Sequence, residues 1–248
     1  MRLLKRIFLI IILLAVAFFC VWLVRSPYFK VKEINFSGNE HYTQGELRSK
    51  VENLWDENIV FLDIKSKVID PLEALPWIEE VNVLKDVFRM TINITVIERR
   101  PAALILRDGK LLLVDVNGRI LENDVGQSQD DLLILQYDGI EEGGAGEFIS
   151  NIDVMEFLAV VNNMGQDIRK RYDHAAFTDK GLVFYDSSGF YVIYQDSSNS
   201  AEKDVSIRTV LNNIKGDETN IEYIDISVHD FPVVKYKNGN EEPVNESE

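Results

Sequence analysis

The pattern of apolar and polar residues divides the chain into a short apolar segment and a long, largely polar remainder. Residues 7–24 form an uncharged run, IFLIIILLAVAFFCVWLV, behind a six-residue leader that carries three basic side chains. At about 1.5 Å of rise per residue, a helix over this run is about 27 Å long, close to the hydrocarbon thickness of a bilayer. We therefore expect residues 1–6 to be a cytoplasmic tail and residues 7–24 to be a transmembrane helix.

A cleaved signal peptide is the first alternative, because Ala15-Val16-Ala17 fits a small-x-small cleavage pattern. Cleavage there would leave Phe18 and Phe19 at the new terminus, and the apolar run exceeds a usual signal sequence, so an uncleaved anchor is favoured. The same two phenylalanines disfavour a lipoprotein signal at Cys20. Basic residues flank the run on both sides, so the positive-inside rule does not fix the orientation. We expect export of the remainder, since long domains translocate largely regardless of their charge.

Residues 31–100 have the pattern of a compact α/β module. Residues 31–36 alternate apolar and polar side chains, and Thr43 with Glu46 has the form of a helix capping box. A second helical stretch covers residues 64–75, where Pro71 predicts a kink or a late start. Strands are expected over 78–84 and 90–96, the latter with Met90, Ile92, Ile94 and Val96 on one buried face. The order β-α-α-β-β predicts one small sheet covered by two helices.

Residues 101–237 are richer in strands. Short apolar runs between turn residues predict strands over 102–106, 111–114, 120–121, 182–185, 190–194, 221–228 and 233–237. Two apolar stripes at helical spacing predict helices over 148–161 and 207–214. Residues 238–248 are acidic, and we expect them to be a disordered tail. The predicted fold class is α+β: one transmembrane helix, the α/β module, and a β-rich domain with flanking helices.

Charge and residue types argue against catalysis in the exported part. Beyond residue 30, the chain carries 21 basic and 41 acidic side chains, a net charge of −20, which disfavours nucleic acid as a partner. Its histidines, His41, His174 and His229, fall in no metal-binding spacing. The single cysteine lies within the apolar run, and no nucleophile motif or phosphate-binding loop is present. We therefore expect a protein that is not an enzyme, with no cofactor, metal or small-molecule substrate.

Recognition of a partner is the function that remains. The last predicted strand ends the folded part of the chain, and a terminal strand is often an edge strand. An edge strand offers unpaired main-chain groups to a strand of another protein. A structural edge with no partner is the alternative reading of the same pattern.

Several short motifs, in order, carry a resemblance to a known family. They are Phe36-Ser37-Gly38-Asn39 with Tyr42-Thr43, Leu75-Pro76-Trp77-Ile78, Val96-Ile97-Glu98-Arg99-Arg100-Pro101-Ala102, Leu113-Val114-Asp115-Val116-Asn117-Gly118 and Tyr223-Ile224-Asp225-Ile226. Together, behind a single anchor, they resemble the FtsQ/DivIB cell-division proteins. The resemblance implies a POTRA domain over residues 31–100 and an FtsQ-type β domain over residues 101–237.

The resemblance also implies a function and a site. It implies a non-catalytic divisome scaffold in the inner membrane, single-pass, extracytoplasmic at its C-terminal end and enriched at the septum, which supports septal peptidoglycan synthesis. Its implied partners are the coiled-coil division proteins FtsB and FtsL. The implied partner-binding residues are Val228, Asp230, Phe231, Val233, Val234 and Tyr236. Two alternatives stay open: a POTRA-containing component of outer-membrane assembly or protein secretion, and an exported cell-wall enzyme.

Overall fold

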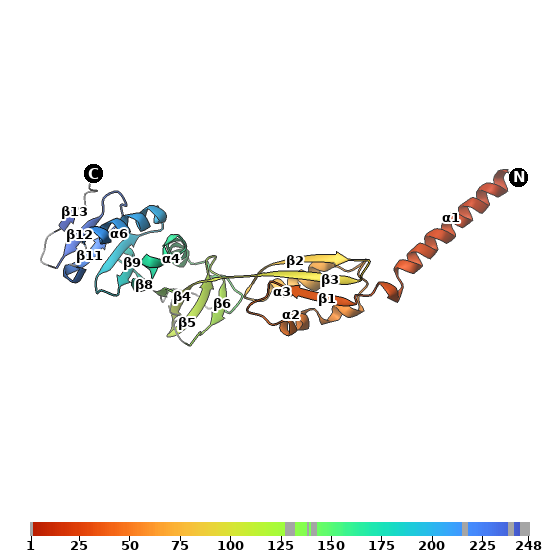
Figure 1. Ribbon diagram of the computed structural model, residues 1–248, viewed down its shortest axis with the longest axis horizontal. Coiled ribbons are helices and arrows are strands. Elements are labelled where there is room, and N and C mark those ends of the chain that lie inside the picture. Colours follow the sequence, from red (N-terminus) through yellow and green to blue (C-terminus); the bar gives the residue numbers. More distant parts are fainter. Residues whose placement is uncertain are drawn as a thin grey trace. The chain divides into compact units, whose positions relative to one another are not determined.

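The computed structural model describes residues 2–126, 132–137, 139, 143–214, 218–237 and 241–243. The chain divides into two compact units, Met1–Arg99 and Arg100–Glu248. Helix α1 (Arg2–Val24) begins the first unit and is followed by the short helix η1 (Pro27–Phe29) (Figure 1). Its segment Lys5–Val24 is long and apolar enough to cross a membrane, and none of the hydrophobic window is buried. We therefore regard α1 as a candidate membrane anchor.

A three-stranded sheet forms the centre of the first unit. Its further elements are β1 (Glu33–Ser37), α2 (Gln44–Lys50), η2 (Glu52–Asp56), the π-helical turn η3 (Lys65–Ile69), α3 (Asp70–Glu73), β2 (Ile78–Asp86) and β3 (Thr91–Glu98). The strand order is β1-β3-β2, with β1 parallel and β2 antiparallel to β3. Apolar side chains of all three strands and of α2, η2, η3 and α3 share one core. This arrangement confirms the predicted β-α-α-β-β order.

The capping residue and the proline that the sequence marks in the first unit both lie at helix boundaries in the structure. Thr43 caps α2: its hydroxyl accepts a hydrogen bond from the Glu46 amide, and the Glu46 carboxylate accepts one from the Thr43 amide. Pro71 stands in the first turn of α3, directly after the π-helical turn η3. The predicted helix over residues 64–75 is accordingly interrupted, with the π-helical turn η3 before α3.

One carboxylate closes the corner between β1 and β3. Glu98, at the end of β3, accepts hydrogen bonds from the amides of Glu40, His41 and Tyr42, at 3.0, 2.7 and 3.2 Å. Gly38 makes this approach possible, because its φ is +80° and a Cβ there would lie 2.2 Å from the carbonyl oxygen of Val96. A single side chain thus holds the turn after β1 against the end of the central strand.

The three motifs of the first unit that carry the family resemblance meet at this same corner. Trp77, just before β2, stacks on His41 with ring centroids 4.0 Å apart. The Arg99 amide donates to the Trp77 carbonyl (2.7 Å), and the Arg99 guanidinium donates to the Ile78 carbonyl (3.1 Å). The indole of Trp77 is half-buried, so it serves packing here.

A ten-stranded sheet forms the second unit. Its strands are β4 (Pro101–Arg107), β5 (Lys110–Asp115), β6 (Ile120–Asn123), β7 (Ile134–Gln136), β8 (Tyr172–Thr178), β9 (Gly181–Asp186), β10 (Tyr191–Gln195), β11 (Ile221–Asp225), β12 (Val233–Tyr236) and β13 (Glu241–Pro243). Its helices are α4 (Ile152–Asn163), α5 (Gln166–Arg169), α6 (Ser200–Ile214) and η4 (Glu218–Asn220). The strand order is β13-β12-β11-β10-β9-β8-β7-β4-β5-β6. Inward-facing residues of the sheet and of α4 and α6 form one core.

The structure corrects several predicted elements of this unit. Strands β7 and β8 were not expected. Strand β7 pairs in parallel with both β4 and β8 and so joins the β4–β6 meander to strands β8–β10. Helix α4 begins at Ile152 behind the cap Asn151, so Phe148 lies outside it. Strand β11 ends at Asp225, which places Val228 in a loop. The expected disordered tail was wrong for Glu241–Pro243, which form β13, and residues 238–240 and 244–248 lie outside the described residues.

A buried lysine fastens α6 to the end of β10. Lys203 is fully buried, and its ammonium donates to the carbonyls of Tyr194 (2.8 Å) and Asp196 (3.2 Å) and to the Asp196 carboxylate (2.9 Å). Burial raises the pKa of Asp196, but hydrogen bonds from Ser198 and from Lys203 outweigh it, and the pKa is lowered overall. The position of α6 against the sheet therefore depends on a charge-assisted contact.

We predict that Glu98→Ala destabilises the first unit by about 1–3 kcal/mol, because it removes the acceptor of three amides at one corner. Urea unfolding followed by circular dichroism measures the effect. Glu79→Ala, at an exposed position of β2, is the matched control. Equal free energies of unfolding for the two variants would show that water replaces the Glu98 carboxylate without loss of stability.

We predict that Lys203→Met destabilises the second unit by about 1–3 kcal/mol at neutral pH, because buried carbonyls lose their donor while the apolar stem is kept. The folded pKa of Asp196 lies below its unfolded value near 4, so its contribution to stability is present above about pH 4 and lost as the pH falls through the folded pKa. Urea titrations at pH 7 and pH 3 should therefore show a smaller acid-induced loss in the variant than in the wild type. The same acid-induced loss in both proteins would contradict this role of Lys203.

Candidate partner-binding edge

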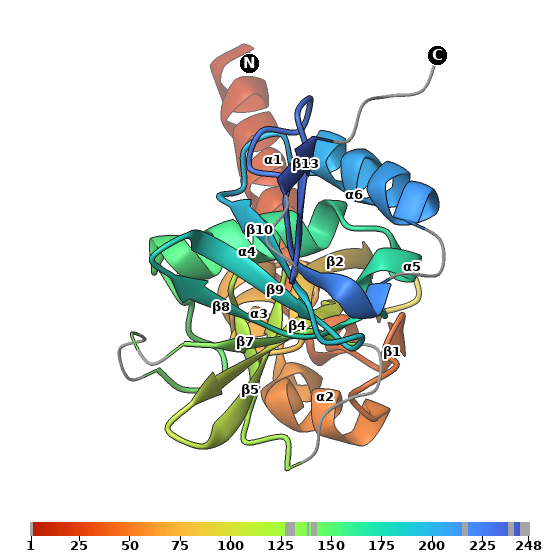
Figure 2. The same ribbon diagram turned by 90° about the vertical axis from the view of Figure 1, so that its left-hand side faces the viewer.

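The loop from β11 to β12 leads the chain to the C-terminal edge of the ten-stranded sheet (Figure 2). The Ile226 amide donates to the Ile193 carbonyl of β10 (3.0 Å), which ties the start of the loop to the sheet. The Phe231 amide donates to the Val228 carbonyl (3.0 Å) and closes a turn. These main-chain bonds hold the apolar side chains of the turn at the surface.

The predicted site residues fall into two groups. In the loop, Val228 is 55% exposed, Phe231 is 76% exposed, and the carboxylate of the exposed Asp230 lies 3.2 Å from the His229 imidazole. On β12, Val233 is half-buried, Val234 is 1% exposed, and Tyr236 packs partly against the core. The structure brings all six residues into one stretch, but the Val234 side chain belongs to the core. The main chain of Val234 lies in β12, where β13 pairs with it.

A hollow beside the loop extends this surface onto α6. It has a volume of about 280 Å³ and is lined by Glu202, Val205, Ser206, Thr209, His229, Asp230 and Pro232. The Ser206 hydroxyl donates to the His229 carbonyl (2.8 Å) and so joins helix and loop. Val205 is 62% exposed beside it. We call Val205, Val228 and Phe231 the apolar patch.

Val205 was missed by the sequence reasoning. The predicted helix began only at Ile207, whereas α6 begins at Ser200 and carries Val205 on its exposed side. An apolar residue among charged neighbours on the outer side of a helix is the signal that a longer helix prediction would have revealed. Exposed apolar residues gathered at one place are characteristic of protein interfaces.

The chemistry of this surface suits binding. Its titratable groups, Glu202, His229 and Asp230, lie at an open rim, and no cluster of three metal-ligating side chains occurs among the described residues. The lining combines the acidic Glu202 and Asp230 with the apolar Val205 and Pro232, and such a mixture of polar and apolar groups suits a protein interface.

Strand β13 covers part of the edge of β12. It pairs antiparallel with Val233, Val234 and Lys235 through Pro243, Glu242 and Glu241. A proline has no amide proton to donate, and a three-residue pairing makes few hydrogen bonds. The tail therefore protects this edge with a short strand that is weakly held.

The other end of the sheet is covered differently. Beside β6, the Ile120 amide donates to the Glu147 carbonyl (2.9 Å), and its carbonyl accepts from the Gly146 amide (2.8 Å). The Gly118 carbonyl accepts from the Ile149 amide (2.8 Å). An ordered segment continuous with the core thus occupies the start of the β6 edge.

Comparison with known proteins gives the family of the first unit directly. A family model described as "POTRA domain, FtsQ-type" matches residues 29–99. This range contains β1 to β3 and the corner closed by Glu98.

Curated relatives extend the similarity beyond that domain. The cell division protein DivIB of Staphylococcus aureus (strain NCTC 8325 / PS 47) is 30% identical over 40% of this chain and 23% of its own length. The cell division protein FtsQ of Koribacter versatilis is 30% identical over 47% of this chain and 36% of its own length. FtsQ of Streptomyces bingchenggensis is 25% identical over 87% of this chain and 80% of its own length.

The first two alignments thus span 23% and 36% of those relatives. The third runs through both units of this chain. The match of an FtsQ-type POTRA domain and the similarity to proteins named FtsQ and DivIB together support the FtsQ/DivIB family for this chain.

Proposed function

We propose that this protein is a membrane-anchored, non-catalytic scaffold of the cell-division machinery. Helix α1 holds it in the cytoplasmic membrane, single-pass, and both folded units lie on the extracytoplasmic side. Support for the division role comes from the relatives, which carry the names of the cell division proteins FtsQ and DivIB. The FtsQ type of the POTRA domain favours this role over outer-membrane assembly or secretion.

The C-terminal edge is the site that we assign to partner binding. The observation that carries the proposal is an apolar patch beside a sheet edge that, within the described part of the chain, is covered by a strand of three residues. A partner that adds a strand to β12 gains main-chain hydrogen bonds, and its side chains can pack on Val228 and Phe231. Main-chain pairing supplies affinity, while the patch supplies selectivity.

The partner that we propose is the FtsB–FtsL pair of coiled-coil division proteins, with FtsB supplying the added strand. In this role, the POTRA domain helps bring the protein to the septum, and the captured pair supports septal peptidoglycan synthesis. The acidic groups Glu202 and Asp230 at the rim of the hollow favour a partner segment with basic residues beside its apolar ones.

Partner binding at β12 requires that β13 yields. A partner strand that faces all four residues of β12 makes more hydrogen bonds than β13, which pairs with three. The tail would then be a replaceable cover that keeps the edge from pairing with other chains before the partner arrives.

We predict that Phe231→Glu weakens binding of the FtsB–FtsL pair by about 2 kcal/mol or more, about 30-fold in Kd, because an anchor residue of the patch becomes charged. Titration of the full chain with the purified pair by interferometry gives the affinity. Ile152→Glu, at an exposed position at the start of α4, is the matched control. Unchanged affinity of Phe231→Glu would remove the patch from the site.

We predict that a chain ending at Asn240, which lacks β13, binds the pair about fivefold more tightly, because about 1 kcal/mol of competing strand pairing is removed. A chain ending at Pro243 keeps β13 and should bind like the full chain. The same titration compares the three lengths. Weaker binding without β13 would mean that the partner uses β13 itself as its docking strand.

A further inference from the structure

One end of the POTRA unit is tied to the exit of α1. Lys32 stands only eight positions after Val24, the last residue of α1, and its amide donates to the Met90 carbonyl (2.8 Å). An extended chain of that length reaches at most about 28 Å. The Asn58 side-chain amide also donates to the Val24 carbonyl (2.7 Å). The turn between β2 and β3 and the loop around Asn58 therefore lie close to the end of the anchor.

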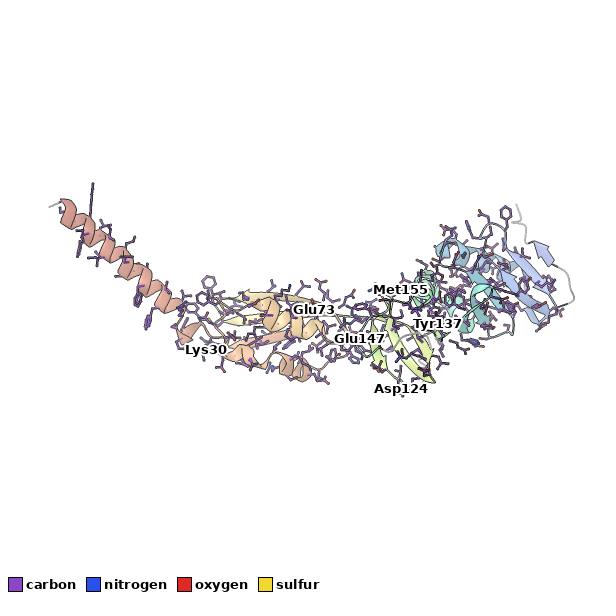
Figure 3. The ribbon with its side chains drawn as sticks, turned by 180° about the vertical axis from the view of Figure 1, so that it is seen from behind. Lys30, Glu73, Asp124, Tyr137, Glu147 and Met155 are labelled. Atoms are coloured by element: carbon purple, nitrogen blue, oxygen red, sulfur yellow. The ribbon has the colours of Figure 1, made fainter. Side chains whose placement is uncertain are left out.

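The sheet register explains why these segments share one end. Strands β1 and β3 are parallel and begin together, with Glu33 opposite Thr91, so the turn before β3 lies where the chain enters the unit from α1 (Figure 1). Lys30, just before β1, marks this end in Figure 3. The Ile59 amide donates to the Phe29 carbonyl (2.9 Å) and fixes the loop there as well.

Three aromatic side chains stand exposed at this end. Phe88, in the turn between β2 and β3, is 95% exposed, and Phe61 and Tyr28 are each 61% exposed. We call Tyr28, Phe61 and Phe88 the membrane-proximal rim. Basic side chains accompany it: Lys32 lies over the Tyr28 ring at 4.8 Å, and Arg89 is next to Phe88.

The turn that carries Phe88 is well organised. The Asp86 carboxylate accepts hydrogen bonds from the amides of Phe88 (3.1 Å) and Arg89 (3.0 Å), and Met90 adopts a φ of +55°. The Lys85 ammonium donates to the Leu62 carbonyl (3.4 Å), which links the end of β2 to the loop that carries Phe61. The two phenylalanines are therefore presented outward from structured backbone that is itself linked to the exit of α1.

We propose that the membrane-proximal rim inserts into the interfacial layer of the bilayer that α1 crosses. Aromatic side chains with adjacent basic groups are favoured at this depth, where the rings leave water and the charges stay at the headgroups. The inference rests on the proposed membrane anchor, which brings the bilayer to this end of the unit. Docked in this way, the POTRA unit is held on the membrane surface in one orientation instead of turning freely on its tether.

The test places an environment-sensitive fluorophore on the full chain in vesicles of phosphatidylcholine and phosphatidylglycerol. In a Cys20→Ala background, cysteines are introduced one at a time as Phe88→Cys, Phe61→Cys and Ile97→Cys, and each is labelled. Ile97, exposed near the opposite end of β3, is the matched control. Quenching by lipids that carry a nitroxide near the headgroup is measured for each position.

We expect blue-shifted emission and several-fold stronger quenching at positions 88 and 61 than at position 97. Water-like emission and equally weak quenching at all three positions would overturn the proposal. It would also be overturned if the labels were shielded from water only after a second protein was added. A label on Cys20 of the otherwise unchanged chain tests the membrane anchor separately from the membrane-proximal rim. Deep-nitroxide quenching at Cys20 with none at position 88 contradicts the rim alone, whereas no quenching at either contradicts the anchor and the rim together.

Discussion

The unpaired main-chain groups at the end of a sheet are the constraint on which the second unit depends. An open ten-stranded sheet has two edges, and each must be paired, covered or offered to a partner. At the β6 end, residues 146–149 cover the start of the edge from within the fold. At the β12 end, the tail supplies three residues that include a proline. The two ends thus differ in how readily a new strand can replace the cover, and the exposed apolar patch lies at the replaceable end.

The first unit follows from local signals that agree with one another. The capping box at Thr43, the break in helix regularity expected at Pro71 and the apolar alternation of β3 each agree with the element that is observed. The corner motifs of the family are explained by Glu98, whose carboxylate serves three amides of the preceding turn. Local sequence signals suffice here because nearly every element carries its own start, stop or periodicity.

The second unit could be predicted only in part. Strand β7 has three residues, and β8 contains His174, Ala175 and Ala176 in place of a clear alternation. The two strands that unite the sheet therefore show little apolar–polar pattern in the sequence from which to predict them. The predicted site residues lie in one stretch at the C-terminal edge, yet the inward direction of Val234 is set by its register with Ile224 in β11. Val205 comes from α6, far away in sequence. Contacts between distant segments decide these features, and no local pattern encodes them.

In-cell photocrosslinking from a probe at Tyr236 tests the central claim most directly, with captured proteins identified by mass spectrometry. A probe at Val116, an exposed position in the turn between β5 and β6 of the same unit, is the control. The account predicts that Tyr236 captures a small single-span coiled-coil division protein and that Val116 does not. Capture of an outer-membrane or secreted protein at Tyr236, or the same division protein at both positions, would contradict partner binding at the C-terminal edge.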